Sequence, residues 1–149
     1  MADKRPIILL IDDNEAVRIF FKDLFWLHGL ESKFQVECAD GVEKGEKMIK
    51  DPETRPEVVF LDLVMPINKD GKIITTPEAG LSLLEKIKSD PELKNVKVVI
   101  FSSYGDKFHR ERAEKLGAEM FLDKAENLPQ DLIKLIDVVD KKYNLSAKK

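Results

Sequence analysis

Residues 58–66 read VVFLDLVMP, a short apolar run that ends in an aspartate and is followed by a Met-Pro pair. Four consecutive apolar residues, two of them β-branched, are typical of a strand that is covered on both faces. Similar runs occupy residues 7–11 (IILLI) and 98–101 (VVIF), and two weaker ones occupy 34–38 and 120–122. We therefore predict one parallel sheet, in which three central strands lie between two edge strands.

Between these runs, apolar residues recur every three or four positions, which is the spacing of one helix face. Thr76 followed by Pro77 predicts a helix start, Gly117 predicts a helix end, and Pro129 opens the last helix. Strand and helix thus alternate five times. This order predicts an α/β protein, a (βα)5 doubly wound parallel sheet with the flavodoxin-like order 2-1-3-4-5.

The 149 residues leave room for one compact domain, which we expect to span residues 1–149 with its core at about 5–143. Asp70-Gly71 stands between Ile67 and the isoleucines at 73–74, and Asp-Gly between apolar residues is a hairpin signal. We expect a hairpin-like insertion at about residues 67–77, after the third strand.

Composition excludes several classes of protein. Apolar residues make up 43% and charged residues 36% of the chain, which favours a globular fold over disorder. The net charge of −3, without a block of Lys and Arg, argues against direct nucleic-acid binding. Cys38 is the only cysteine, and no apolar stretch suits a secretion signal or a membrane span. We expect a soluble cytoplasmic protein that binds neither nucleic acid nor membrane.

Polar side chains stand where the predicted strands end: Asp12 and Asp13 after the first, Asp62 after the third, Ser102 at the fourth and Lys124 at the fifth. In such sheets the ligand crevice lies beyond the carboxyl ends of the strands. Three converging carboxylates repel one another unless a cation joins them, and Mg²⁺ prefers oxygen ligands. With a lysine to neutralise a transferring phosphoryl group, Asp62 is the predicted nucleophile.

These residues resemble the motifs of the response regulator receiver family, and the resemblance covers essentially the whole chain. Residues 11–14 (IDDN) are similar to the acidic pair after the first strand, and residues 61–66 (LDLVMP) to the end of the phosphoacceptor strand. Ser102 matches the switch hydroxyl and Lys124 the invariant lysine. The interval between them (124 − 102 = 22) is the usual one.

The resemblance implies a stand-alone phosphoacceptor response regulator of a two-component or phosphorelay system, similar to chemotaxis or phytochrome response regulators. It implies that Asp62 takes a phosphoryl group from a histidine kinase or a histidine phosphotransfer protein. It also implies that Asp13, Asp62 and the main-chain carbonyl of Val64 bind Mg²⁺, while Asp12 contributes directly or through water. Such a protein catalyses only its own phosphorylation and dephosphorylation.

The resemblance further implies that Ser102 and Phe121 form the switch that signals to a downstream protein target. Val64 and Tyr104 occupy the positions that flank the attacking water in this family. Because both are bulky and neither is a base, we expect a slowly decaying phosphoaspartate. Ala125 stands where the family usually has proline, so the loop there is expected to take another path.

Two surfaces are expected to bind proteins. Ile19 and Trp26, seven residues apart on the first helix, lie opposite its predicted buried stripe and suggest a docking surface for the kinase or phosphotransfer domain. The stripe itself comprises Val17, Phe20, Phe21 and Leu24. Ile133 and Val138 lie off the stripe of the last helix and could serve a homodimer. The stretch between Pro66 and Gly80 is longer than in typical receivers, and we hypothesise that it gates access of a kinase or phosphatase.

Two alternatives remain. A phosphohydrolase of the haloacid-dehalogenase kind also uses an aspartate nucleophile after a strand, but it needs a second aspartate two positions on, where Val64 stands. A degenerate receiver would act as an interaction module without phosphorylation, and the complete acidic set argues against it. The sequence names neither the kinase nor the target, and it leaves the oligomeric state open, as it does the choice between output regulator and relay intermediate.

Overall fold

The computed structural model describes residues 5–103, 105–126 and 129–145. Its central sheet is parallel, with the strand order β2-β1-β3-β6-β7. The strands are β1 (Ile7–Ile11), β2 (Gln35–Ala39), β3 (Val58–Leu61), β6 (Lys97–Ser102) and β7 (Met120–Asp123). The predicted fold class and strand order are therefore confirmed, with the edge strand β2 starting one residue later than expected.

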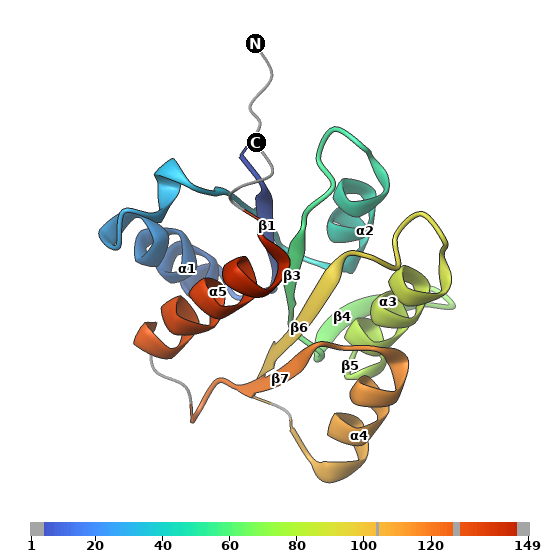
Figure 1. Cartoon of the computed structure of the whole chain (residues 1–149). Helices are drawn as coiled ribbons and strands as arrows, with labels where there is room; N and C mark the ends of the chain where they lie inside the picture. The colour runs from blue at the N-terminus through green and yellow to red at the C-terminus, as the bar shows by residue number, and fades with distance from the viewer. Residues whose placement is uncertain (1–4, 104, 127–128, 146–149) are drawn as a thin grey trace.

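Helices cover both faces of the sheet. Figure 1 shows α1 and α5 on one face and α2, α3 and α4 on the other. The helices are α1 (Glu15–Leu27), α2 (Val42–Lys50), α3 (Glu78–Ser89), α4 (Lys107–Leu116) and α5 (Pro129–Tyr143), with a 3₁₀ turn η1 (Leu30–Ser32) after α1. This double cover explains why the central strands are apolar on both sides.

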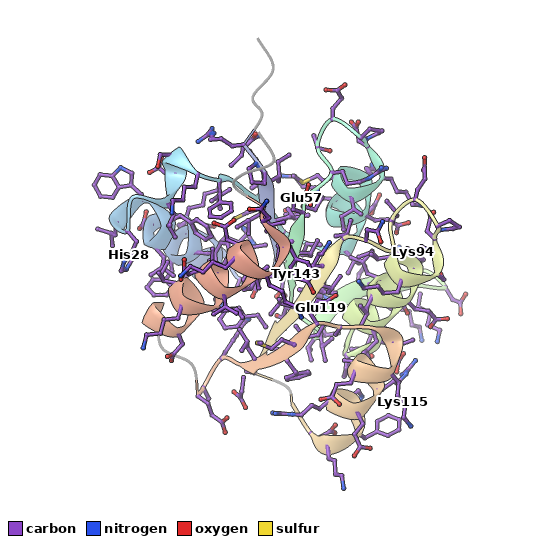
Figure 2. All side chains as sticks on the ribbon, in the orientation of Figure 1. His28, Glu57, Lys94, Lys115, Glu119 and Tyr143 are labelled. Atoms are coloured by element: carbon purple, nitrogen blue, oxygen red, sulfur yellow. The ribbon has the colours of Figure 1, made fainter. Side chains whose placement is uncertain are left out.

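The two faces carry separate apolar cores. On the side of α1 and α5, Phe21 lies 5.1 Å from Phe25 and 5.2 Å from Phe60, measured between ring centroids. Phe25 in turn meets the edge of Phe34 at 6.4 Å. Such tilted aromatic contacts lock α1 against the sheet. At the other end of the chain, the Tyr143 hydroxyl of α5 donates to the Glu119 carboxylate at 2.9 Å (Figure 2), which ties α5 to the start of β7.

The buried stripe of α1 differs from the prediction at one residue. Phe20 is 48% exposed, whereas Phe25 is fully buried. Phe20 and Phe21 are neighbours about 100° apart around a helix, so only one can point at the sheet. The core contacts of Phe21 fix the orientation, and Phe20 turns outward beside Ile19.

Helix ends largely follow the sequence signals. The Asn14 side chain accepts hydrogen bonds from the first turn of α1, and Gly117 ends α4 with a φ of 105°. At α3 the start is one residue later than predicted: Pro77 is the N-cap, and the Thr76 hydroxyl accepts the Glu78 N–H at 3.2 Å. Thr76 thus still caps a backbone N–H of the first turn of α3 that has no partner within the helix.

The insertion after β3 is a two-stranded antiparallel hairpin of β4 (Met65–Lys69) and β5 (Lys72–Thr76), as predicted from its turn. Asp70 and Gly71 both have positive φ, 53° and 82°, which is the conformation of a type I′ turn. The Asn68 carboxamide oxygen accepts the Gly71 N–H at 3.1 Å. The hairpin begins earlier than expected, at Met65, directly after the loop that carries Asp62.

None of the helices within the described ranges combines the length and the apolar character that crossing a membrane would require.

Candidate functional site

Three carboxylates converge at the carboxyl edge of the sheet, where β1 and β3 lie side by side. One oxygen each of Asp12, Asp13 and Asp62 can be chosen so that all lie within 4.8 Å of one another. Asp12 is fully buried, Asp62 is nearly so, and Asp13 is exposed. Strand pairing produces this arrangement, because Ile11 and Leu61, the last residues of β1 and β3, are register partners.

Lys124 brings a positive charge to the buried pair. It follows β7, and its Nζ lies 2.5 Å from Asp12 Oδ2 and 3.3 Å from Asp62 Oδ2. The Lys124 N–H also donates to the Ser102 carbonyl at 3.0 Å, which fixes the start of the side chain. Three carboxylates outnumber the one ammonium that contacts them, and a divalent cation would balance such an excess of negative charge.

The oxygens of Asp12 are already engaged. Oδ1 accepts the Asn14 N–H at 2.9 Å, while Oδ2 accepts from Lys124. The Arg18 guanidinium of α1 donates to the Asp12 carbonyl at 2.8 Å, a contact that the sequence analysis missed. The only sequence feature that could have predicted this contact is the position of Arg18, one helical turn into α1 and six residues after Asp12. Both carboxylate oxygens and the carbonyl of Asp12 thus have hydrogen-bond partners, which hold this residue in place.

The surroundings of Asp62 alter its pKa. Burial raises the pKa of Asp62 above its ordinary value and the nearby Asp12 carboxylate adds to the rise, while Lys124 and a hydrogen bond from the Ser102 hydroxyl lower the pKa in part. Ser102 itself is fully buried at the end of β6. Any further positive charge near Asp62 would stabilise its ionised form.

The loop after β3 is clamped to α3. The Gly80 N–H donates to the Leu63 carbonyl at 3.0 Å, and a Cβ at Gly80 would lie 2.5 Å from the Asp62 carbonyl oxygen. Only glycine therefore permits this approach. In the sequence, Gly80 marks only the end of the stretch that is longer than in typical receivers, and this contact could not be predicted from it. Val64, half-buried, lies within the clamped loop.

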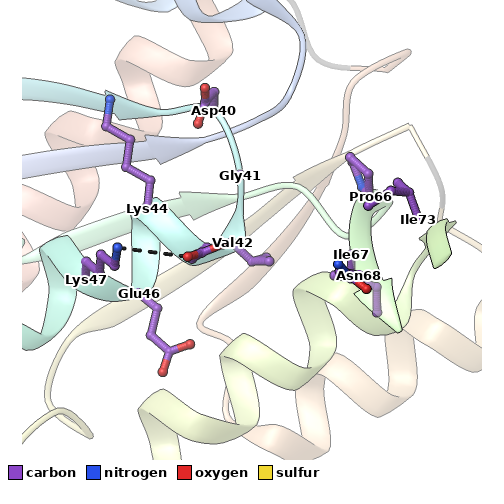
Figure 3. A pocket seen from close by; sticks show the side chains of 11 residues that line it. Asp40, Gly41, Val42, Lys44, Glu46, Lys47, Pro66, Ile67, Asn68 and Ile73 are labelled. Atoms are coloured by element: carbon purple, nitrogen blue, oxygen red, sulfur yellow. Dashed lines mark ion pairs between the residues drawn. The ribbon is translucent and has the colours of Figure 1, made fainter. Parts of the chain in front are cut away.

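A groove of about 890 Å³ lies beside the acidic cluster and contains none of its three aspartates. Figure 3 shows its two walls, the start of α2 on one side and the hairpin on the other. Lys44 and Lys47 belong to the first wall, and Pro66, Ile67 and Ile73 to the second. The hairpin thus forms one wall of a groove that the three clustered aspartates do not line.

Comparison with known proteins decides the family. The family model of the response regulator receiver domain matches residues 8–137 of the chain. The chain belongs to the response regulator receiver family. Receivers of this family are signalling proteins that interact with histidine kinases and with downstream targets.

Individual relatives are distant. The polar-differentiation response regulator DivK of Brucella anthropi is 24% identical over 123 residues, which cover 83% of this chain and 87% of DivK. A CheY-like receiver from Methanospirillum hungatei superimposes with a TM-score of 0.69 at 21% identity, covering 97% of this chain and 98% of that one. The Mn²⁺-bound response regulator Rcp1 has a TM-score of 0.68 at 21% identity, with 93% and 94% covered.

Phe121, which occupies the position that receivers use as an aromatic switch, is half-buried. Phe121 of β7 packs against the core on the side of α2, α3 and α4, and the Arg110 guanidinium of α4 lies 4.8 Å from its ring centroid. This cation–π contact was not foreseen. It holds the aromatic ring between β7 and α4, the face that the resemblance associates with switching.

Two other expectations concern loops. Tyr104 lies outside the described residues.

Ala125 stands where receivers usually have proline. No peptide bond among the described residues is cis, and the Ala125 N–H donates to the Asp123 carboxylate at 2.7 Å. A second bond, from the Glu126 N–H to the Asp123 carbonyl at 3.1 Å, closes the turn.

The expected protein-binding surfaces are partly exposed. On α1, Ile19 and Trp26 are 53% and 68% exposed, and the outward-turned Phe20 and Leu27 (70%) extend them. We call these four residues the α1 patch. On α5, Val138 is exposed, whereas Ile133 is half-buried against the core.

Proposed function

We propose that this receiver accepts a phosphoryl group from phosphohistidine on Asp62, with Mg²⁺ bound beside it, and signals by a change in conformation. The observation that carries the proposal is the convergence of Asp12, Asp13 and Asp62 with the Lys124 ammonium in contact with both buried acids. A purely structural ion pair would need one acid for one lysine. The surplus of acid points to a bound cation.

The donor set fits Mg²⁺. All three ligand candidates are carboxylates, the hard oxygen donors that this ion prefers, and Asp13 is open to solvent, so that water can complete the shell. Asp13, Asp62 and the Val64 carbonyl are the proposed ligands, with Asp12 acting directly or through water. The presence of Mn²⁺ in the related Rcp1 supports a divalent ion. When bound, the ion neutralises charge on the transferring phosphoryl group.

Asp62 acts as the nucleophile. One of its carboxylate oxygens attacks phosphorus, the new O–P bond forms as the P–N bond to the donor histidine breaks, and the histidine nitrogen keeps the electron pair. The attack needs Asp62 ionised, which its raised pKa opposes and Lys124 favours. Lys124 also lies close enough to pair with a phosphoryl oxygen, and the Ser102 hydroxyl can donate to another.

The switch follows from the same contacts. Drawing Ser102 toward a phosphoryl group would free space behind it, and Phe121 would move inward from its half-buried position. Such a movement breaks the contact between Phe121 and Arg110, so that the surface of α4, β7 and α5 changes. This surface is the proposed site for a downstream protein target.

The α1 patch is the proposed docking surface for the histidine kinase or histidine phosphotransfer protein. Its Ile19 and Phe20 lie in the first half of α1, which starts directly after Asp12 and Asp13, whereas Trp26 and Leu27 lie in the last turn of the helix. Exposed apolar residues grouped in this way mark protein interaction sites. The proposed compartment is the cytoplasm, which the single cysteine favours, and residues 1–149 are taken as one domain. No catalysis on other substrates is proposed.

Intact mass spectrometry after incubation with acetyl phosphate and Mg²⁺ tests the proposal. We expect one phosphoryl adduct that requires Mg²⁺, vanishes in Asp62→Asn and persists in Asp40→Asn, a carboxylate beside the crevice but outside the cluster. A folded wild type that forms no adduct would favour a receiver that needs its partner for phosphorylation, or an interaction module that acts without phosphorylation. An adduct that survives in Asp62→Asn would assign the nucleophile elsewhere.

A further inference from the structure

The outer edge of β5 is an open strand edge. β5 pairs with β4 on one side, and no other strand in the described part of the chain pairs with it. In a hairpin with a two-residue turn, the pair flanking the turn, here Lys69 and Lys72, is hydrogen-bonded. Hydrogen-bonded pairs alternate from there, so the backbone groups of Ile73 and Thr75 point away from β4.

The two outer edges of the hairpin differ. On β4, Pro66 is the register partner of Thr75 and lies at an outward-pointing position, so this edge lacks an N–H there. β5 has no proline, and four of its five residues are β-branched. Ile73 is 69% exposed and Ile74 is 38% exposed. A strand edge of this kind is a template for pairing with another strand.

The hydrogen-bonding pattern selects a second copy of the same strand. In an antiparallel pair with a two-fold axis at Ile74, Ile73 of each copy lies opposite Thr75 of the other, and both residues offer outward N–H and C=O groups. An axis at Thr75 would set Ile73 against Pro77, which has no N–H, and an axis at Ile73 would set Thr75 against Gly71 in the turn. Only the axis at Ile74 satisfies all the outward groups of β5.

Charge is compatible with the same register. Lys72, the one charged residue of β5, lies opposite Thr76 of the second copy, so that no like charges meet within the pair. Ile74 meets its own copy on the axis, where side chains of a non-hydrogen-bonded pair lie closest. The outer edge of β5 is therefore self-complementary, as a two-fold interface requires.

We propose that this protein forms a two-fold homodimer by antiparallel pairing of β5 with β5, which joins two hairpins into one four-stranded sheet. The proposal goes beyond the phosphoacceptor function and does not depend on it. A contact of five residues a side is smaller than the usual stable interface, so the dimer is weak, with a Kd on the order of 100 µM.

Sedimentation velocity of the full chain, from about 1 µM to 1 mM, tests the proposal. Ile74→Lys places two cations on the two-fold axis and should raise the Kd at least tenfold, as should Ile74→Glu. An equimolar mixture of these two variants pairs opposite charges and should dimerise again. Thr75→Pro removes an outward N–H without touching the bonds to β4, and it should also weaken the dimer. Val138→Lys tests the rival homodimer face on α5, which the sequence suggested through Ile133 and Val138, and it should leave the β5 dimer intact.

Recovery in the mixed sample separates a broken interface from a misfolded chain, and circular dichroism melts check each variant. A wild type that stays monomeric to about 1 mM would overturn the proposal. A dimer that persists in Ile74→Lys and Thr75→Pro, or is lost in Val138→Lys, would place the contact on another face and overturn it equally. Failure of the mixed variants to pair would exclude the axis at Ile74.

Discussion

Replacing Gly80 by alanine should destabilise the fold and disturb the site together. The added Cβ would lie 2.5 Å from the Asp62 carbonyl oxygen and 2.6 Å from the Leu63 Cα. Ordinary contact begins at 3.4 Å, so α3 and the loop must separate by 0.9 Å (3.4 − 2.5 = 0.9). Both clashing groups are backbone, which cannot rotate away.

The cost follows from three contributions. Overpacking against rigid backbone costs about 2–3 kcal/mol. The Gly80 N–H to Leu63 carbonyl bond, now 3.0 Å, would stretch beyond bonding distance and lose about 1 kcal/mol. The alanine recovers about 1 kcal/mol of helix propensity. The net loss is about 2–3 kcal/mol, which lowers the melting temperature by about 5–10 °C in a protein of this size.

Two other glycines provide controls. Gly41, the N-cap of α2, has nothing within 4 Å of a Cβ, so Gly41→Ala should cost only the poorer N-cap preference of alanine and lower the melting temperature less than Gly80→Ala. At Gly45 the Cβ would meet the Ile11 Cδ1, the movable end of a side chain, so Gly45→Ala should fall between the two. Thermal melts followed by circular dichroism rank the three variants.

The same displacement should reach the metal ligands, because Asp62 and Val64 lie in the clamped loop. We expect Mg²⁺ affinity, measured by calorimetric titration, to fall about tenfold in Gly80→Ala, the size of effect seen when groups that orient metal ligands are disturbed. A Gly80→Ala protein that melts like Gly41→Ala and binds Mg²⁺ normally would refute this reasoning.

Four further predictions follow from the site and the hairpin. Lys124→Met leaves the buried Asp12 and Asp62 without their cation, and should cost about 3 kcal/mol in urea unfolding at neutral pH. Because the folded state raises the pKa of Asp62, the free energy of unfolding of the metal-free protein should fall as pH rises through that pKa; in Asp62→Asn, pH-dependent melts should show this fall to be absent. Tyr104→Ala should shorten the lifetime of the phosphoaspartate in mass-spectrometric decay curves, and a longer lifetime would contradict the shielding role. Deleting residues 68–75 should raise the rates of phosphorylation or decay in the same assay, and unchanged rates would rule out a gate.

Much of the fold could be predicted from the sequence because the burial of a strand determines which residue types it contains. A strand covered on both faces has no polar side chain to place, so residues 58–61 and 98–101 could only be central. The convergence of Asp12, Asp13 and Asp62 followed in turn, since parallel strands bring their carboxyl ends to one edge. These inferences need only the order of elements.

Contacts between elements could not be predicted in the same way. Phe20 and Phe21 both fit a helical stripe, and only the packing of α1 on Phe60 decides between them. Likewise, the bond from Arg18 to the Asp12 carbonyl depends on where α1 lies relative to β1. The stacking of Arg110 on Phe121 depends on how α4 meets β7. Helix periodicity predicts on which face of a helix each residue lies, but not which residue of another element it contacts.

The position of the hairpin shows how a receiver can gain a new surface without losing its site. The ends of the insertion are held at a fixed separation, because Leu63 is bonded to Gly80 and Met65 pairs with Thr76. Chain added between such fixed ends costs closure entropy that rises only slowly with length. The Asp62 loop therefore keeps its geometry whatever the hairpin does. For this reason single substitutions on the outer edge of β5 can test the pairing without displacing Asp62, whereas deletion of residues 68–75 tests access to Asp62.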